Sequence, residues 1–253
     1  MKKSKHNASV KLRIWPFFLC FFLFSCRTIT HSKTEVEMPP LIVTFSFDDG
    51  PTAHDNTTAR LLDVLKKYHV QAMFALLGEN AKQYPELVRR IYDEGHFIVN
   101  HGYADIWARK MEDNEFKENL VKGETAISSA LGREWYPRLY RPHGGFYNSR
   151  QKRIWQEAGY TMIPGNIRVY DTRSKKNDLD KTVRNVIRKV EKQGGGIILL
   201  HDSCGSASRM EEALEKNPEG SWNRSWIPEA VEEIIIALLD KGYTFGSPLY
   251  SLN

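Results

Sequence analysis

Short apolar runs alternate with longer amphipathic stretches from Leu41 onward, and this alternation constrains the fold more than any other feature of the chain. The apolar runs predict strands at residues 41–47, 71–77, 97–100, 160–163, 196–200 and 243–245. Leucine, isoleucine or valine at spacings of three and four predict helices at 57–68, 81–94, 116–131, 150–158, 179–191 and 228–241. Strands that alternate with helices are typical of a parallel sheet covered by helices. We therefore expect an α/β fold, a distorted or incomplete (β/α) barrel in a single domain.

The positive charge of the chain is concentrated in its first 25 residues. They carry five basic side chains and no acidic one, and without them the 36 lysines and arginines fall to 31, equal to the 31 acidic residues. A neutral globular part gives no reason to expect nucleic acid as a partner. The remaining composition, 41% hydrophobic and 26% charged, is ordinary for a globular protein and disfavours long disorder or a coiled coil.

An apolar run at residues 14–24 follows the basic stretch. It is too short to cross a bilayer as a helix, which takes about 20 residues, and with its basic flank it predicts a secretory signal peptide at 1–25. Leu23-Phe24-Ser25-Cys26 resembles a lipobox, in which Cys26 becomes the lipidated first residue. We expect a membrane-anchored lipoprotein that faces the periplasm or the cell exterior. A secreted soluble protein and an uncleaved anchor are the alternatives.

The cysteines agree with export. Cys20 would leave with the leader and Cys26 would carry lipid, so Cys204 would be the one remaining thiol and no internal disulfide could form. Residues 28–40 are polar and end in two prolines, which predicts a tether. The expected organisation is a signal peptide at 1–25, a tether at 26–40 and a globular domain at 41–253.

Polar residues that could carry chemistry follow the expected strands, whose carboxyl ends meet at one edge of a parallel sheet. Asp48 and Asp49 come directly after the first strand, and adjacent carboxylates repel each other unless a cation or proton lies between them. His101 and Asp105 are four residues apart, so on a helical turn both could face one metal ion. Taken singly, these patterns are also compatible with an aspartate-rich turn and a polar pair.

Two further residues occupy similar positions. Arg141 follows a short apolar run and could hold a carboxylate by a bidentate contact. His201 ends the most apolar strand of the chain and is followed at once by Asp202. A solvated arginine and a structural histidine are the ordinary alternatives for these positions.

Taken together, these stretches resemble the polysaccharide deacetylases of carbohydrate esterase family four, the NodB homology domain. The resemblance covers about residues 41–249. Its most specific parts are TFSFDDGP at 44–51, similar to the family's T-F-D-D-G-P element, and LHD at 200–202, similar to its final L-H-D element. The resemblance implies a distorted (β/α) barrel that uses a divalent metal to hydrolyse N-acetyl groups, in some members O-acetyl groups, on glycans.

The resemblance also implies a metal site. Asp49 and His101 match two of the family's ligands, and Asp105 stands where the family has the second histidine of an H-x-x-x-H pair. The expected ligand set is therefore Asp49, His101 and Asp105. Zinc is the expected metal. Manganese and cobalt are alternatives, since an additional carboxylate ligand shifts the preference of the site toward harder ions such as manganese. If Asp105 does not bind the metal, His143 is the first candidate to replace it.

The catalytic roles follow from the same resemblance. Asp48 would be the general base that takes a proton from the attacking water, and Arg141 would hold it. His201 would be the general acid for the departing amine, and Asp171 would orient it. An acetamide is a poor electrophile with a poor leaving group, so its hydrolysis needs an activated water, an oxyanion stabiliser and an acid for the nitrogen.

Two other departures from the family pattern concern the substrate pocket. His143 and Gly144 stand where the family usually has proline and tyrosine, and Ser174-Lys175-Lys176 occupies the region of a usual tryptophan. Other aromatic side chains could stack on sugar rings, although packing is their more common role. They are Tyr103, Trp107, Tyr147, Trp222 and Trp226.

The sequence thus predicts a metal-dependent hydrolase at the cell envelope. Its expected substrate is an acetylated polysaccharide, either peptidoglycan or a chitin-like poly-N-acetylglucosamine. One alternative is a degenerate, non-hydrolytic glycan-binding protein that uses the same groove, suggested by Asp105 and the altered third motif. Another is a hydrolase of the same fold that acts on a small cyclic amide, which the export signal disfavours.

Overall fold

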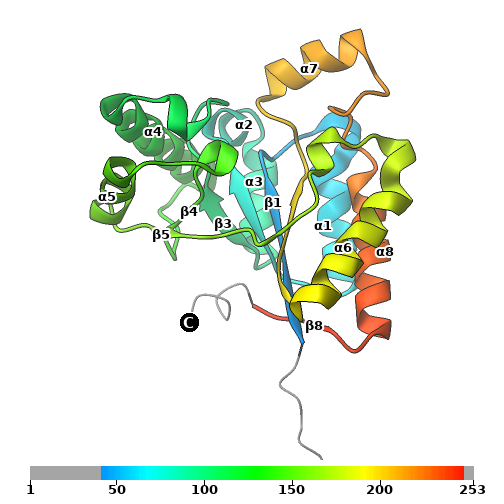
Figure 1. The fold of residues 1–253 in the computed structure, drawn as a ribbon. Helices are drawn as coiled ribbons and strands as arrows, with labels where there is room; N and C mark the ends of the chain where they lie inside the picture. Colours follow the sequence, from blue (N-terminus) through cyan, green and yellow to red (C-terminus); the bar gives the residue numbers. More distant parts are fainter. Residues whose placement is uncertain (1–40, 248–253) are drawn as a thin grey trace, which may run out of the picture. The chain divides into compact units, whose positions relative to one another are not determined.

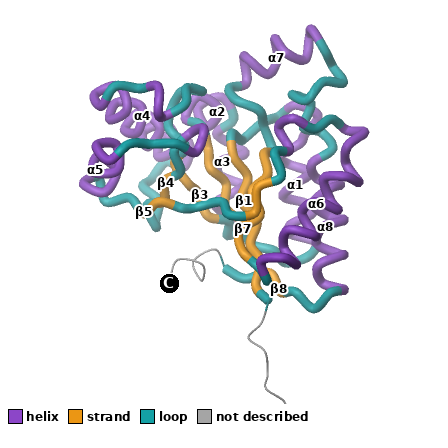
Figure 2. The backbone as a smooth tube through the Cα atoms, viewed as in Figure 1, coloured by secondary structure: helices purple, strands orange, loops and turns teal. Residues whose placement is uncertain are grey.

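The computed structural model describes residues 41–247, so the predicted signal peptide and tether lie outside the described residues. A parallel sheet runs through this part of the chain and is flanked by helices (Figures 1 and 2). Its strands are β1 (Ile42–Asp48), β2 (Ala72–Leu76), β3 (Phe97–Asn100), β4 (Leu139–Tyr140), β5 (Thr161–Met162), β6 (Ile167–Arg168), β7 (Gly196–His201) and β8 (Thr244–Phe245). The expected strands are all present within one or two residues of their predicted bounds.

The strand order shows why the barrel is incomplete. The order is β5-β4-β3-β2-β1-β7-β6, and β8 pairs with the beginning of β1. Every described pair is parallel, and no pairing joins β5 to β6 within residues 41–247. The sheet therefore stays open between its first and last members, which confirms the predicted distorted or incomplete (β/α) barrel.

The helices form two packed groups. In one, α1 and α6 both pack against α8; in the other, α4 packs against α2, α3 and α5. Helix α7 follows β7. Their bounds are α1 (Thr57–Lys67), α2 (Gly78–Gln83), α3 (Pro85–Asp93), α4 (Asp113–Leu131), α5 (Ser149–Glu157), α6 (Leu179–Gln193), α7 (Ala207–Lys216) and α8 (Ile227–Asp240).

The alternation of side chains along β1 places Asp48 on the inner face of the curled sheet. Phe45 and Phe47 are fully buried in the main core together with residues of α1 and α8. Successive side chains of a strand point to opposite faces, so Ser46 and Asp48 lie on the other face. A smaller buried cluster, which includes Met73 of β2 and side chains of β3, β4 and β7, is separate from the main core. The apolar pattern of β1 thus determines where its carboxylate points.

Four elements differ from the prediction. The expected helix at 81–94 is divided into α2 and α3, because Pro85 has no N–H to continue the first helix and instead begins the second. Strands β4 and β6 have two residues each, too few for a strand pattern, and α7 was not predicted although its buried residues Ala207, Met210 and Leu214 lie at helical spacing. No helix within residues 41–247 is both long and apolar enough to cross a membrane.

Candidate active site

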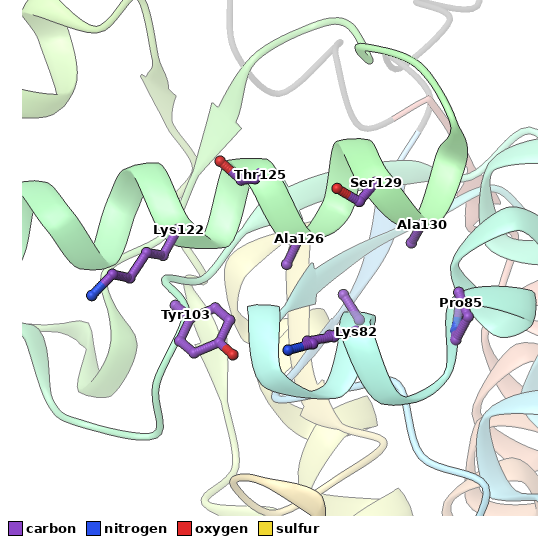
Figure 3. A pocket seen from close by; sticks show the side chains of 9 residues that line it. Lys82, Pro85, Tyr103, Lys122, Thr125, Ala126, Ser129 and Ala130 are labelled. Atoms are coloured by element: carbon purple, nitrogen blue, oxygen red, sulfur yellow. The ribbon is translucent and has the colours of Figure 1, made fainter.

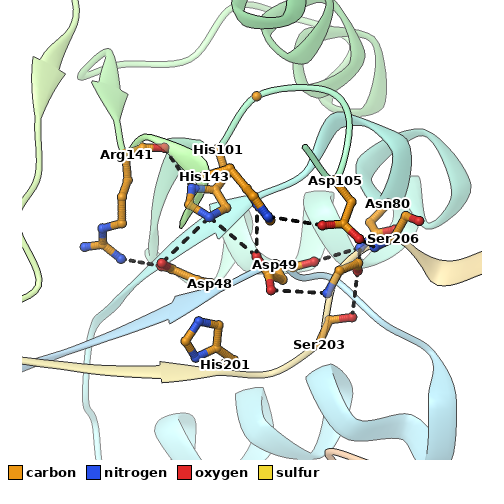
Figure 4. A network of polar contacts seen from close by, with 12 residues as sticks. Asp48, Asp49, Asn80, His101, Asp105, Arg141, His143, His201, Ser203 and Ser206 are labelled. Carbon is orange, nitrogen blue, oxygen red and sulfur yellow. Dashed lines mark hydrogen bonds and ion pairs between the residues drawn. The ribbon is translucent and has the colours of Figure 1, made fainter. Parts of the chain in front are cut away.

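The register of the sheet brings the predicted catalytic residues to one edge. Asp48 pairs with His201 across β1 and β7, so the two residues lie side by side at the carboxyl ends of neighbouring strands. Asn100 pairs with Tyr140 across β3 and β4, which places the next residues, His101 and Arg141, at the same edge. Figure 4 shows these side chains around Asp49. The chemistry that the sequence distributes over 150 residues therefore meets in one place.

A cleft of about 430 Å³ opens at this edge. Its lining includes all the predicted site residues, which are Asp48, Asp49, His101, Asp105, Arg141, Asp171 and His201. A larger cavity of about 710 Å³ lies between α2 and α4 (Figure 3). Its lining contains two lysines, hydroxyl groups and apolar side chains but no carboxylate or imidazole, so it offers neither a base nor a metal ligand.

Arg141 holds Asp48 in the cleft. The guanidinium is buried, forms an ion pair with Asp48 Oδ1 through Nη1 and donates to Ser46 Oγ at 2.6 Å. Its Nε and Nη2 donate to the carbonyls of Ile163 and Pro164 at 3.2 and 3.1 Å. All three guanidinium nitrogens are therefore committed. This fixes one carboxylate oxygen of Asp48 and leaves the other, Oδ2, 3.8 Å from His101 Nε2.

Asp49, His101 and His143 form a group that could hold a metal ion. Asp49 Oδ1 lies 3.4 Å from His101 Nε2 and 3.5 Å from His143 Nδ1, and one ligand atom from each residue lies within 4.8 Å of the other two. Asp49 adopts a left-handed backbone conformation, with φ of 69°. This conformation turns the chain sharply at the end of β1 and separates the directions of the two adjacent carboxylates.

The opposite atom of each of these side chains is already bound. His101 Nδ1 is 2.8 Å from the Arg141 carbonyl, His143 Nε2 is 3.1 Å from Asp105 Oδ1, and Asp49 Oδ2 accepts from the Gly205 N–H at 3.1 Å. An imidazole that donates from one nitrogen presents a lone pair on the other. His143 Nδ1 is buried and has no hydrogen-bond partner among the described residues. The donor set thus fits a divalent ion bound by two imidazoles and a carboxylate.

The charges of these groups agree with a cation site. Burial acts to raise the pKa of the Asp49 carboxyl, but the contact with His101 and the nearby His143 and His201 hold that pKa far below its usual value. Burial acts to lower the pKa of His143, but the hydrogen bond to Asp105 and the charge of Asp49 raise it. Asp49 is therefore a carboxylate at neutral pH.

Asp105 lies beside this group, in contact with one of its members. Its carboxylate contacts His143 Nε2 through Oδ1, forms an ion pair with Arg209 through Oδ2 and lies 3.4 Å from the Ser206 N–H. The three residues that converge on one point include His143 instead of Asp105. The structure thus places the predicted ligands Asp49 and His101 together and adds a histidine that the sequence pattern left as an alternative.

His201 is held by a buried charge network. His201 Nδ1 lies 3.0 Å from Asp171 Oδ1, and the His201 N–H donates to Asp171 Oδ2 at 2.9 Å. Arg224, which is fully buried, forms an ion pair with Asp171 and donates to the His201 carbonyl at 3.2 Å. Arg224 was not predicted, because a single arginine between two tryptophans carries no sequence signal. Its contacts with the Asp171 carboxylate, the Asp171 carbonyl and the His201 carbonyl fix both partners.

Asp171 sets the protonation state of His201. Burial alone would lower the pKa of His201, but the charge and hydrogen bond of Asp171 outweigh it and raise that pKa to about 9. His201 is therefore an imidazolium at neutral pH. The pKa of Asp171 is correspondingly lowered, since His201 and Arg224 together outweigh the effect of its burial.

We expect Asp171→Asn to lower the pKa of His201 by about one unit or more, because the imidazolium loses its counter-charge and still lies near Arg224. NMR titration of the histidine ring protons measures this directly. Asp180→Asn, which changes an exposed aspartate of α6, is the matched control and should leave the titration unchanged. An unaltered His201 pKa in Asp171→Asn would mean that burial and the other carboxylates alone set it.

Two other polar residues near the cleft take no part in this chemistry. Asp202 follows His201 but points away from it, and Asp202 Oδ2 accepts from Thr58 Oγ1 at 2.6 Å. Its burial raises its pKa to about 7. Cys204 lines the cleft, but burial raises its thiol pKa to about 12, so it is not a thiolate nucleophile at neutral pH.

The chain is similar in sequence to known proteins. A family model described as polysaccharide deacetylase matches residues 35–163. Two peptidoglycan-N-acetylglucosamine deacetylases of Bacillus cereus are each 31% identical to the chain, over 69% and 72% of its length. The aligned regions span 61% of the first relative and 82% of the second.

Solved structures agree with the sequence relatives. The Bc1960 peptidoglycan N-acetylglucosamine deacetylase has a TM-score of 0.68 and 28% identity, over 84% of this chain and 88% of that one. A family 4 acetyl xylan esterase from Clostridium thermocellum, solved with a cobalt ion, has a TM-score of 0.64 and 25% identity, over 83% and 90% of the two chains.

Proposed function

Since the chain belongs to the polysaccharide deacetylase family, we propose that it is a metal-dependent hydrolase that removes N-acetyl groups from a glycan of the cell envelope. The observation that carries this proposal is the pairing of Asp48 with His201 at the end of β1 and β7, beside the Asp49, His101 and His143 group. One residue is a held carboxylate and the other an imidazolium at neutral pH, which are the states needed for a general base and a general acid.

The chain's own residues account for the proton transfers. A bound divalent ion would polarise the acetyl carbonyl and make a water molecule easier to deprotonate. Asp48 is positioned to accept the proton of the attacking water, because Arg141 fixes Oδ1 and leaves Oδ2 facing the cleft. His201 is positioned to give its proton to the departing nitrogen. Gly144 also lines the cleft, where its backbone N–H can approach the oxygen that gains negative charge.

The rim of the cleft suits a sugar polymer that carries negative charge. Trp107, Phe146 and Tyr170 line it and are 43%, 62% and 63% exposed, so part of each ring can contact a sugar, although basic side chains also lie over these rings. Arg168 and Arg173 line the same cleft and are exposed. Peptide stems give peptidoglycan carboxylates that these guanidinium groups can bind, and chitin-like glycans lack such groups. Peptidoglycan is therefore the favoured substrate.

The residues predicted to stack on sugars fall into two groups, those that line the cleft and those that lie elsewhere. Trp107 and Trp222 line the cleft, whereas Trp226 is buried in the main core and Tyr147 stacks edge-on against Trp155. Tyr103 lines the cavity between α2 and α4. Trp107 and Trp222 are the two of the set that can contact a glycan in this site.

Acetate release tests the proposed function. Peptidoglycan and an acetylated chito-oligosaccharide are each incubated with the zinc-loaded protein, acetate is quantified, and mass spectrometry locates the new amines. We expect acetate and free amines from peptidoglycan, and a higher kcat/KM for it than for the neutral oligosaccharide. Binding of both glycans without acetate release would instead support the non-hydrolytic alternative, which has no need for the Asp48 and His201 pair.

We also propose that the protein is exported and anchored through lipid on Cys26. The support is the sequence of the leader, a basic stretch and a short apolar run that ends at Ser25 and Cys26. We expect Cys26→Ser to move the protein from the membrane fraction to the soluble fraction, since a single lipidated cysteine would be the anchor. Cys20→Ser, inside the leader, is the control and should stay in the membrane fraction. A soluble wild-type protein whose amino terminus is not Cys26 would exclude the anchor.

A further inference from the structure

We propose that His143 is the third metal ligand and that Asp105 positions it without binding the metal, with Arg209 holding Asp105 in turn. This inference rests on the metal site of the proposed function. It starts from the buried Nδ1 of His143, which faces Asp49 Oδ1 at 3.5 Å and has no hydrogen-bond partner among the described residues. A buried, unpartnered nitrogen aimed at a carboxylate is the arrangement expected of a ligand atom whose ion lies between them.

The orientation of the His143 ring is determined by Asp105. The contact of His143 Nε2 with Asp105 Oδ1 at 3.1 Å makes Nε2 the protonated nitrogen and leaves the lone pair on Nδ1. In His101 the two ring nitrogens exchange roles. Its Nδ1 contacts the Arg141 carbonyl, and its Nε2 faces Asp49. A carboxylate that accepts from the far nitrogen of a metal-bound imidazole fixes the ring and raises its basicity.

Both oxygens of the Asp105 carboxylate have partners. Oδ2 forms an ion pair with Arg209 of α7 and lies 3.4 Å from the Ser206 N–H. A side chain at Gly205 would collide with this carboxylate, so the backbone packs directly against it. The side chain of Asp105 is 10% exposed. With Oδ1 on His143 and Oδ2 on Arg209, Asp105 has no oxygen directed at the point where Asp49, His101 and His143 converge.

The test is the affinity of the protein for zinc and cobalt in the absence of any glycan, measured by titration calorimetry and by the visible spectrum of the cobalt form. We expect Asp105→Ala to weaken metal binding by about 10- to 100-fold, as for other residues that orient a ligand. The visible spectrum of the cobalt form should still show the same number of protein ligands as in the wild type. Asp105→Asn should stay within a few-fold of the wild type, because its amide oxygen can still accept from His143 Nε2. His143→Ala should weaken binding more than Asp105→Ala and change the spectrum.

Controls separate positioning from a general effect of charge or folding. Glu79→Gln removes a half-buried carboxylate of α2 near Asp105 and should leave the metal affinity unchanged. Arg209→Ala should weaken affinity less than Asp105→Ala does, and Arg209→Lys should restore part of the loss. Thermal unfolding of each variant checks that it is folded.

A structure of the zinc-loaded protein tests the same claim without any substitution. We expect His143 Nδ1 about 2.0–2.1 Å from the ion and both Asp105 oxygens beyond bonding distance. An Asp105 oxygen bound to the ion, or unchanged affinity in His143→Ala with a large loss in Asp105→Asn, would overturn the inference. Metal binding as expected without acetate release would leave this inference intact and overturn the proposed function.

Discussion

Replacing Asp48 with asparagine is expected to lower kcat for acetate release by about a thousandfold, within the range of a lost general base, while the metal content stays at the wild-type level. The amide fills the same space but cannot take a proton from water. Arg141 keeps its contacts with Ser46, Ile163 and Pro164, so the site should remain assembled. Because Asp49 and both histidines are untouched, the variant should bind zinc normally.

Three measurements on one preparation check this expectation: kcat, zinc content by mass spectrometry and the temperature of unfolding. Asp63→Asn is the matched control, since Asp63 is an exposed carboxylate paired with Arg90 far from the cleft. It should keep full activity. Loss of zinc together with activity in Asp48→Asn would reassign Asp48 as a ligand, and retention of activity would exclude it as the base.

His201→Ala is expected to lower kcat by about a hundredfold or more on an N-acetylated glycan, because the amine then leaves without a proton donor. The loss should be much smaller on an aryl acetate, whose phenolate leaving group departs without protonation. His69→Ala, which changes an exposed histidine, is the control. Equal losses on both substrates would show that His201 does not act as the acid.

The pH dependence of the wild type should carry the same signature. A general acid works only in its protonated form, and the pKa of His201 in the metal-free protein is raised to about 9, so activity should be lost as the pH rises toward that value. In Asp171→Asn the loss should begin at lower pH, because the His201 pKa falls. A bound cation near the imidazole also lowers the His201 pKa, so the metal-loaded enzyme should lose activity at a lower pH than the metal-free pKa indicates.

The sheet was predictable because its signals are local. A short apolar run such as GIILL predicts a buried strand without reference to the rest of the chain. Parallel pairing of such strands then brings the residue after each run to the same edge of the sheet. That is why Asp48 and His201 could be placed together from the sequence. Strand β6 was missed because two residues give no period, although Ile167 pairs with Ile198 in the finished sheet.

The metal site was predictable only in part. Asp49 and His101 follow strands, but His143 enters the site through a short 3₁₀ turn after β4. Its direction depends on Asp105 in the loop after β3 and on Arg209 in α7. Spacing along the chain favoured Asp105, since it is four residues from His101. Arg224 shows the same limit, because its role comes from being buried against Asp171.

Titration of the metal-free protein with zinc, with bound zinc and acetate release from peptidoglycan followed in the same sample, tests the central claim most directly. We expect activity to be absent after chelation, to rise in proportion to bound zinc and to reach its plateau at one ion per chain. His143→Ala should require far more zinc for the same occupancy. Acetate release that continues unchanged in the chelated protein would contradict the account.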